Sequence, residues 1–340
     1  MESVLISFII PCYNVANTLC RCLDSVFALN IPETDFEVIA IDDASSDDTL
    51  SILRNYSTRH KNLIVLRHLV NRNLGAARNT GLAACKGKYV AFVDSDDEAC
   101  DGIINALNLM EKLELDLVAM RLEKVSEEGV IISDLAIPEL SGKVFSGLQF
   151  QSEHPFWNVA VWSYIFKQSL LNRVHYPFAE GVFYEDVDYV CNHFLKANRM
   201  SFSDKCGYRF YNNSKSITHT FSHKHCFGYA YLGIRMLTLY ERLEDKSSSF
   251  ANSILEGGSY NLMQAFRRLT KLESTSEIRG FYNLLDSKVD RNKIHIYREP
   301  TYCWTSWTRL GVKHRSVMVL LAGIIVSFLQ FARRIKVAFS

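Results

Sequence analysis

The sequence lacks the cysteine pattern of a disulfide-stabilised protein. Its cysteines number 9, which is odd, and no two of them form a Cys-x-x-Cys pair. Cys20 and Cys22 lie closest together, and no second pair accompanies them. We therefore expect reduced thiols, as in a cytosolic protein.

The chain also lacks an excess of either charge and any leader segment. Its 38 lysines and arginines nearly balance 37 aspartates and glutamates, which does not favour a nucleic-acid-binding protein. The apolar stretch 4–10 follows an acid rather than a basic segment, so it does not resemble a signal peptide. Internal repeats and low-complexity linkers are absent too. What remains is a chain of 340 residues, 48% hydrophobic, which is enough for a substantial core.

Apolar runs and amphipathic segments alternate through the first 120 residues. Expected strands cover 5–10, 36–41, 63–66, 89–93 and 116–120, and expected helices cover 16–28, 45–56, 75–84 and 102–113. This order predicts an α/β fold with a Rossmann-like, doubly wound and mostly parallel sheet. Residues 124–155 are expected to form an irregular insertion, 156–222 a second compact region, and 226–285 helices of a C-terminal extension.

Acidic residues follow two of the expected strands. Asp42 and Asp43 end the strand at 36–41, and Asp94-Ser95-Asp96-Asp97 ends the strand at 89–93. Ligands of open α/β sheets bind at such strand ends, so these carboxylates are expected to share a site. Crowded acids repel one another, and an Asp-x-Asp pair offers the oxygen ligands that a hard divalent cation prefers. The pattern indicates a metal that holds a diphosphate.

Four motifs together resemble glycosyltransferase family 2, which has the GT-A fold. They are SFIIPCYN at 7–14, IDDASSDDT at 41–49, NRNLGAARNTG at 71–81 and DSDD at 94–97. Two further segments, 162–166 and 180–186, are similar to the acceptor side of that family. The resemblance implies a catalytic domain over 1–222, divided into a nucleotide-sugar half at 1–125 and an acceptor half at 126–222, followed by a helical region at 223–340.

The resemblance assigns the nucleotide-sugar site to the strand ends. Pro11 and Tyr13 would lie at the nucleotide, with Tyr13 against the base and Pro11 shaping the loop; a plain strand-to-helix turn is the alternative. Asp43 would accept a hydrogen bond from the imide N–H of uracil, whereas Ser45 or Ser46 could instead cap the next helix.

The basic and acidic motifs would bind the rest of the donor. Arg78 would reach a base or phosphate, or form a structural ion pair with the Asp94 loop. Asp94 and Ser95 would lie on the ribose side, and Asp96 would bind Mg²⁺ or Mn²⁺, which bridges the phosphates. Asp97 is expected to cap the helix that begins near Gly102.

Asp186 is the expected catalytic base and Glu185 its neighbour in binding or positioning. The family carries its base in this Glu-Asp position, and a carboxylate can take the proton of an attacking hydroxyl. The alternative is that Asp186 caps a helix over 187–196. A direct displacement by that hydroxyl would invert the anomeric centre.

Acceptor contacts are the least specific part of the pattern. Trp162 and Tyr164 could stack on a sugar or belong to a core, and Tyr164 replaces a lysine that the family often has. His219, in a basic segment at 211–225, could close over the diphosphate or be part of a solvated loop.

The C-terminal region contains an apolar stretch of 16 residues, 317–332, with basic residues on both sides. A spanning helix needs about 20 such residues, so segment 313–336 predicts a helix that lies in or re-enters a membrane surface, or one that packs on the protein. The basic flanks favour anionic lipids.

The sequence as a whole predicts an inverting, metal-dependent glycosyltransferase. It would move a sugar from a nucleotide donor, most simply a UDP-sugar, to a glycan or lipid-linked saccharide on the cytoplasmic face of the cell membrane. A sugar nucleotidyltransferase is the enzymatic alternative, although the first loop, 11–16, is not glycine-rich. A non-catalytic module that binds nucleotide sugars or glycans is the other alternative.

Overall fold

The computed structural model describes residues 4–154, 160–212 and 222–269, together with 276, 277, 279–281 and 283. The chain divides into two compact units. The first consists of Met1–Gly181 and Tyr189–Ser216, and the second of Val182–Asp188 and Ile217–Ser340. The predicted boundary between 222 and 223 stays a prediction.

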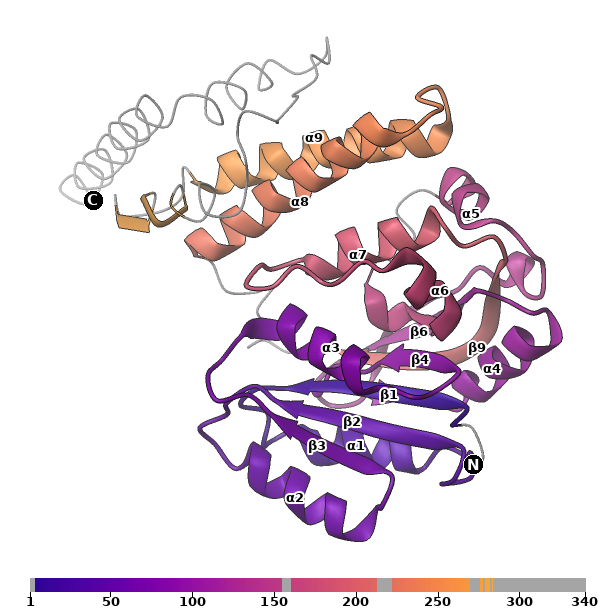
Figure 1. Cartoon of the computed structure of the whole chain (residues 1–340), viewed down its shortest axis with the longest axis vertical. Coiled ribbons are helices and arrows are strands. Elements are labelled where there is room, and N and C mark those ends of the chain that lie inside the picture. Colours follow the sequence, from indigo (N-terminus) through magenta and orange to yellow (C-terminus); the bar gives the residue numbers. More distant parts are fainter. Residues whose placement is uncertain are drawn as a thin grey trace. The chain divides into compact units, whose positions relative to one another are not determined.

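The first unit is built on a single sheet (Figure 1). Its strands are ordered β3-β2-β1-β4-β8-β6-β9-β5, and β7 pairs with β6 beside this path. The strands are β1 (Ile6–Cys12), β2 (Phe36–Asp42), β3 (Leu63–Arg67), β4 (Tyr89–Phe92), β5 (Glu98–Ala99), β6 (Leu117–Val125), β7 (Ile131–Leu135), β8 (Tyr164–Lys167) and β9 (Met200–Tyr211). The helices of its first half are α1 (Leu19–Phe27), α2 (Thr49–Arg59), α3 (Asn73–Ala84) and α4 (Gly102–Lys112).

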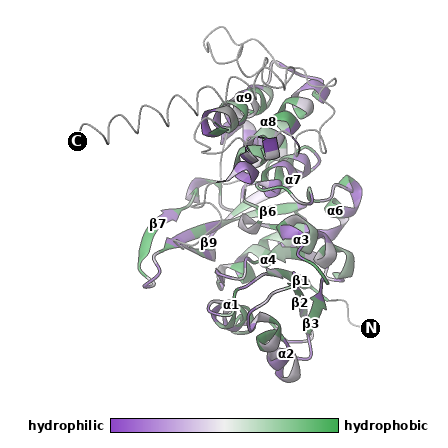
Figure 2. Ribbon diagram, turned by 90° about the vertical axis from the view of Figure 1, so that its left-hand side faces the viewer, coloured by the Kyte–Doolittle hydropathy of each residue, from purple (hydrophilic) through white to green (hydrophobic). Residues whose placement is uncertain are grey.

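The predicted parallel sheet is confirmed for its first four strands. β1 pairs in parallel with β2 and β4, and β2 pairs in parallel with β3. Every residue of β1 and β2 is buried, because helices cover both faces, and these strands are mostly hydrophobic (Figure 2). Alternate residues enter opposite cores, with Phe8 in one cluster and Ile9 in the other. All of these strands point their carboxyl ends to the same edge.

The second half of the sheet differs from the expected simple repeat. β8 pairs antiparallel with both β4 and β6, so β6 is not a direct neighbour of β4. β6 runs parallel to β9, and β7 forms a hairpin with β6. Residues 126–212 therefore do not merely cover the sheet but complete it. Short elements join these strands, namely η1 (Pro138–Leu140), α5 (Gly147–Glu153), η2 (Val161–Ser163) and α6 (Gln168–Val174).

Gly102 begins α4 in direct contact with β9. A Cβ atom placed on it would lie 2.2 Å from the carbonyl oxygen of Cys206, which is backbone and cannot move aside cheaply. We expect Gly102→Ala to lower the free energy of unfolding by about 3 kcal/mol, as overpacking does. Urea denaturation measures this, with Asn108→Ala on the exposed face of α4 as the control. Equal stabilities of the two variants would show that α4 does not pack on β9 in this way.

The second unit contains two long helices, α8 (His223–Arg242) and α9 (Ser249–Leu269), which lie side by side in Figure 1. Small residues allow their backbones to approach, since a Cβ on Gly233 would lie 2.8 Å from the carbonyl oxygen of Gly258. These helices confirm the helical character expected for 226–285 as far as the described residues reach. α7 (Glu185–Phe194) begins in this unit and ends in the first.

Within the described ranges, none of the helices combines the length and the apolar composition needed to cross a bilayer. Segment 313–336, predicted to associate with a membrane, lies outside the described residues.

Candidate active site at the strand ends

The loops after β1 and β2 are bound to each other by their side chains. The backbone N–H groups of Asn14, Val15 and Ala16 donate to Ser45 Oγ (3.0 Å), Thr49 Oγ1 (2.9 Å) and Asp47 Oδ2 (3.0 Å). Ser45 therefore braces the first loop, and the described structure shows no side-chain cap on α2. These hydrogen bonds hold the segments that follow β1 and β2 together.

Pro11 and Tyr13 have different environments. Pro11 is buried within β1, which fits a residue that shapes the strand. Tyr13 follows the strand and leaves 49% of its surface exposed, so its ring is available to a planar ligand. Contact between either residue and a nucleotide stays a prediction.

Asp43 is buried at the end of β2 and organises the loop that leads into α3. Its Oδ1 accepts the N–H of Arg72 (2.9 Å), and its Oδ2 accepts the N–H of Asn73 (2.8 Å). His68 Nδ1 lies 2.6 Å from the same Oδ1. The oxygens of a carboxylate accept hydrogen bonds, so each of these contacts uses part of the acceptor capacity of Asp43.

Arg78 lies in helix α3 and contacts the acidic loop that follows β4. Its Nη2 donates to Asp94 Oδ1 at 2.7 Å, and the Arg78 side chain is 1% exposed. The ion pair with the Asp94 loop, one of the two roles expected for Arg78, is therefore present. Asp94 remains 24% exposed, so its carboxylate is accessible from one side.

Helix α1 holds the backbone of the acidic loop. Cys22 Sγ lies 3.5 Å from the carbonyl oxygen of Asp94, Thr18 Oγ1 donates to that of Ser95 at 3.1 Å, and Arg21 donates to that of Asp96. Thr18, Arg21 and Cys22 are spaced i, i+3 and i+4, so they share one helix face. Three consecutive carbonyl groups are thus fixed by one face of a helix.

Asp97 does not cap α4, contrary to the prediction. It is buried and accepts hydrogen bonds from Tyr208 Oη (2.7 Å) and the N–H of Tyr211 (2.8 Å), both on β9. Burial raises the pKa of the Asp97 carboxyl well above its usual value, and the charges of Asp96 and Asp94 raise it further against the bonds from β9. The three acids are therefore close enough to repel one another.

This raised pKa predicts a pH-dependent stability. Below about pH 4 Asp97 is protonated whether the chain is folded or not, and as the pH rises the unfolded chain ionises first, so the folded state loses relative stability. Asp97→Asn cannot ionise. We expect the free energy of unfolding of this variant, relative to the native chain, to increase with pH between about 4 and 7, by at most about 1.4 kcal/mol per pH unit.

Urea denaturation at several pH values measures that difference. Asp101→Asn, an exposed acid at the start of α4, is the matched control and should give a nearly flat difference. A flat profile for Asp97→Asn as well would contradict the raised pKa.

The carboxylate oxygens of the acidic loop are suitable ligands for a cation that is also bound by phosphate oxygens of the substrate. Within the described part of the chain, no cluster of three or more His, Cys, Asp or Glu side chains could enclose a metal ion. Asp94 and Asp96 supply carboxylate oxygens, and the side chain of Asp94 is 24% exposed beside its ion pair with Arg78. Mg²⁺ and Mn²⁺ commonly bind through one or two carboxylates plus phosphate oxygens. The residues present fit such an ion.

The three predicted acceptor residues differ in their environment. Tyr164 is completely buried and packs on Phe194 with ring centroids 5.4 Å apart, so it is a core residue rather than a contact for a sugar. Trp162 stacks on Tyr208 at 4.6 Å and is only partly buried. His219 lies outside the described residues.

Glu185 and Asp186 open α7 within the second unit. The helix begins at Glu185, so Asp186 lies in its first turn and does not cap it from outside. Asp186 Oδ1 accepts the N–H of Val187 at 3.0 Å. Tyr184, just before the helix, has a left-handed backbone with φ of 65°, which is strained for a tyrosine.

Helix α8 supports this strained turn. The ring of Tyr184 packs on Tyr229 at 4.6 Å, and Arg235 Nε lies 3.1 Å from Asp188 Oδ2. A Cβ on Gly228 would lie 2.9 Å from the carbonyl oxygen of Phe183, so only glycine fits there. This support is not predictable from the sequence, because nothing in residues 226–285 marks a partner for residues 183–188.

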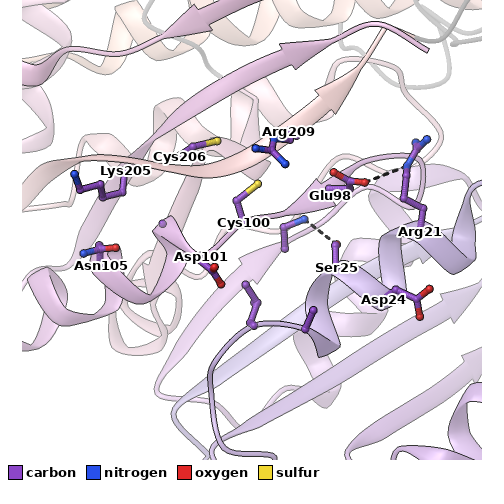
Figure 3. Close-up of a pocket in the computed structure, with 14 residues that line it drawn as sticks. Arg21, Asp24, Ser25, Glu98, Cys100, Asp101, Asn105, Lys205, Cys206 and Arg209 are labelled. Carbon is purple, nitrogen blue, oxygen red and sulfur yellow. Dashed lines mark hydrogen bonds and ion pairs between the residues drawn. The ribbon is translucent and has the colours of Figure 1, made fainter. Parts of the chain in front are cut away.

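A separate pocket of about 930 Å³ lies between α1, the start of α4 and β9 (Figure 3). Charged residues of both signs line it, namely Arg21, Asp24, Glu98, Asp101, Lys205 and Arg209. No predicted site residue lines it. Two of its lining residues are linked to the acidic loop: Arg21 donates to the backbone of Asp96, and Glu98, which directly follows the loop, forms an ion pair with Arg21 (3.7 Å).

The chain matches known proteins over the same region. Residues 7–174 match the family model described as glycosyl transferase family 2. The chain is 30% identical over 207 residues to the poly(ribitol-phosphate) beta-glucosyltransferase of Bacillus spizizenii, covering 58% of this chain and 31% of the relative. It is 29% identical over 221 residues to glycosyltransferase EpsJ of Bacillus subtilis, covering 63% of each. The chain thus spans less than two thirds of the length of these relatives.

Solved structures share the fold. TarS 1–349 of S. aureus, in complex with UDP-GlcNAc, superimposes with a TM-score of 0.59 at 19% identity, covering 93% of this chain and 81% of that one. The mannosyltransferase PcManGT of Pyrobaculum calidifontis, in complex with GDP-Man and Mn²⁺, gives 0.56 at 16% identity, covering 94% and 88%. At these identities the likeness establishes the fold, which is the expected GT-A architecture.

Proposed function

The chain carries a domain of glycosyltransferase family 2 in residues 7–174, and from this premise we propose that it transfers a sugar from a UDP-sugar to a hydroxyl group of a growing surface glycan. The observation that carries the proposal is the constellation at the strand ends. Asp43 at β2, the Arg78–Asp94 ion pair and the Asp94–Asp96 loop gather where open α/β sheets bind ligands.

Each of these residues has a distinct role in the proposal. Asp43 binds the base, and Asp94 binds the ribose with its orientation set by Arg78. Asp96 holds Mg²⁺ or Mn²⁺, which when bound neutralises negative charge on the departing diphosphate. Asp186 accepts the proton of the acceptor hydroxyl at its carboxylate as that oxygen attacks the anomeric carbon, and Glu185 orients the acceptor. A single displacement of this kind inverts the anomeric centre.

A surface glycan as acceptor follows from the relatives. The Bacillus spizizenii protein is named for a poly(ribitol-phosphate) substrate, and TarS of Staphylococcus aureus, 28% identical over 208 residues, is named as a poly(ribitol-phosphate) beta-N-acetylglucosaminyltransferase. We propose a polymer or lipid-linked saccharide of this general kind. Attachment to the inner face of the cell membrane through segment 313–336 is a further proposal from the sequence, and fractionation of the full chain into membrane and soluble parts tests it.

The first loop argues against the nucleotidyltransferase alternative. Such an enzyme needs free backbone N–H groups after the first strand to cradle phosphates. Here the N–H groups of Asn14, Val15 and Ala16 all donate to side chains of the second loop. The same N–H groups cannot also bind a phosphate without breaking that bracing.

A hydrolysis screen tests the proposed function. The full chain is incubated with UDP-sugars and GDP-sugars, with Mn²⁺ or with a chelator, and free nucleotide is measured. We expect slow release of UDP that needs the metal, because water can replace the acceptor. Absence of hydrolysis together with absence of metal-dependent UDP binding would contradict the proposal. The non-catalytic alternative predicts binding without any hydrolysis.

A further inference from the structure

His68 lies at the end of β3, where its ring is buried between two partners. Nδ1 lies 2.6 Å from Asp43 Oδ1, and Nε2 lies 2.9 Å from Thr80 Oγ1. The His68 side chain is 7% exposed and that of Asp43 is 5% exposed. Asp43 accepts only, so Nδ1 must carry the proton of this hydrogen bond. The Thr80 hydroxyl, which can donate or accept a hydrogen bond, lies at the other ring nitrogen and holds the ring in this orientation.

The hydrogen-bond donors around Asp43 occupy its two carboxylate oxygens unequally. Each carboxylate oxygen has about two acceptor positions. Oδ1 is filled by His68 Nδ1–H and the N–H of Arg72, whereas Oδ2 receives only the N–H of Asn73. Among the described residues, one acceptor position of Asp43 therefore remains, and it lies on Oδ2.

We propose that His68 determines the base specificity of the donor site, by filling Asp43 Oδ1 so that the carboxylate can bind a base with one N–H donor but not a base with two. This inference rests on the proposed function, because it takes Asp43 to face the base. Uracil presents a single donor, N3–H, on its pairing edge. Guanine presents N1–H and an adjacent amino group, which together need both oxygens of one carboxylate.

Guanine would leave one of its two N–H groups without an acceptor on Asp43, and this would disfavour guanine relative to uracil. A buried polar group without a partner is costly, and sites that depend on such pairing reject the mismatched ligand strongly. The fold alone does not decide the base, since one structural relative is in complex with UDP-GlcNAc and another with GDP-Man. His68 supplies a local reason for uridine in this chain.

Two substitutions of His68 separate its two contacts. In His68→Asn the side-chain amide can take the place of Nδ1–H and still donate to Asp43, but it does not reach Thr80. In His68→Gln the amide lies nearer to the position of Nε2, so the bond to Asp43 is lost. Titration calorimetry of the full chain with UDP and with GDP, at constant Mn²⁺, gives the affinity ratio for each variant.

We expect the native chain and His68→Asn to prefer UDP over GDP by at least about tenfold. His68→Gln should weaken UDP binding and bring the ratio to within about threefold of unity, because Oδ1 regains an acceptor position for guanine. His60→Gln is the matched control, since His60 precedes β3 and stacks on Phe27 away from Asp43. Its UDP to GDP ratio should equal that of the native chain.

A folded His68→Gln variant with the native ratio would overturn the proposal, as would equal losses in His68→Asn and His68→Gln. If neither folds, the native chain decides, because a ratio of UDP to GDP affinity within about threefold of unity there would equally overturn the proposal. Asp43→Asn separates this inference from the proposed function. Native UDP binding in Asp43→Asn rejects Asp43 as the base contact, whereas loss of binding there with native ratios in the His68 variants rejects only the role of His68.

Discussion

Asp96→Ala should abolish metal-dependent binding of UDP and lower the turnover number by about 10³-fold or more, equivalent to about 4 kcal/mol of transition-state stabilisation. The carboxylate of Asp96 is the proposed protein ligand of the metal, and alanine offers no replacement. The fold should persist, because the hydrogen bond from Arg21 to the backbone carbonyl group of this residue does not depend on its side chain.

Calorimetry with UDP, with and without Mn²⁺, measures the binding, and thermal melting checks the fold. Asp101→Ala removes an exposed acid five residues further along and should change neither. Binding of UDP by Asp96→Ala with the native dependence on metal would show that the ligand is another residue. Asp96→Ala should also lower the raised pKa of Asp97, because the charge of Asp96 contributes to it.

Asp186→Asn should lower the turnover number by about 10²- to 10⁴-fold and leave the Kd of the donor nearly unchanged. Asparagine has the size of aspartate and its amide oxygen can still accept the N–H of Val187, so the start of α7 is preserved. What it lacks is a basic oxygen for the acceptor proton.

Steady-state kinetics over a range of pH, combined with calorimetry of the donor, tests this. Asp186→Asn should lower kcat and leave the Kd of the donor nearly unchanged. Glu185→Gln provides the comparison, because Glu185 is proposed to orient the acceptor and not to take its proton. Near-native kcat in Asp186→Asn, with an inactive Glu185→Gln, would move the base to Glu185.

The parts of the fold that depend on local pattern were predictable. The alternation of buried strands and amphipathic helices gave β1 to β4 and α1 to α4 within a few residues, because their burial on both sides leaves a strong apolar signal. The position of Asp43, Asp94 and Asp96 at strand ends followed from the parallel order alone. The ion pair between Arg78 and Asp94 was one of the two roles expected.

Contacts between distant segments were not predictable in the same way. Asp97 is bound by Tyr208, 111 residues away, so its sequence context as a helix cap was misleading. Tyr164 enters the core because β8 is inserted antiparallel beside β4, and a strand of four residues carries too little pattern to reveal its direction. His68 escaped notice because a single histidine after a strand has no signature of its own.

The assignment of Val182–Asp188 to the second unit has a consequence for how the enzyme can be divided. In the sequence, this heptapeptide is flanked on both sides by segments of the first unit. Two of its packing partners, Tyr229 and Arg235, nevertheless belong to α8. A cut after residue 222 would therefore not detach an appendage. It would separate the turn that bears Glu185 and Asp186 from the side chains of α8 that hold it. In the proposed reaction, the residues that bind the donor and the residue that takes the acceptor proton would then depend on different stretches of the polypeptide, and both stretches would be needed.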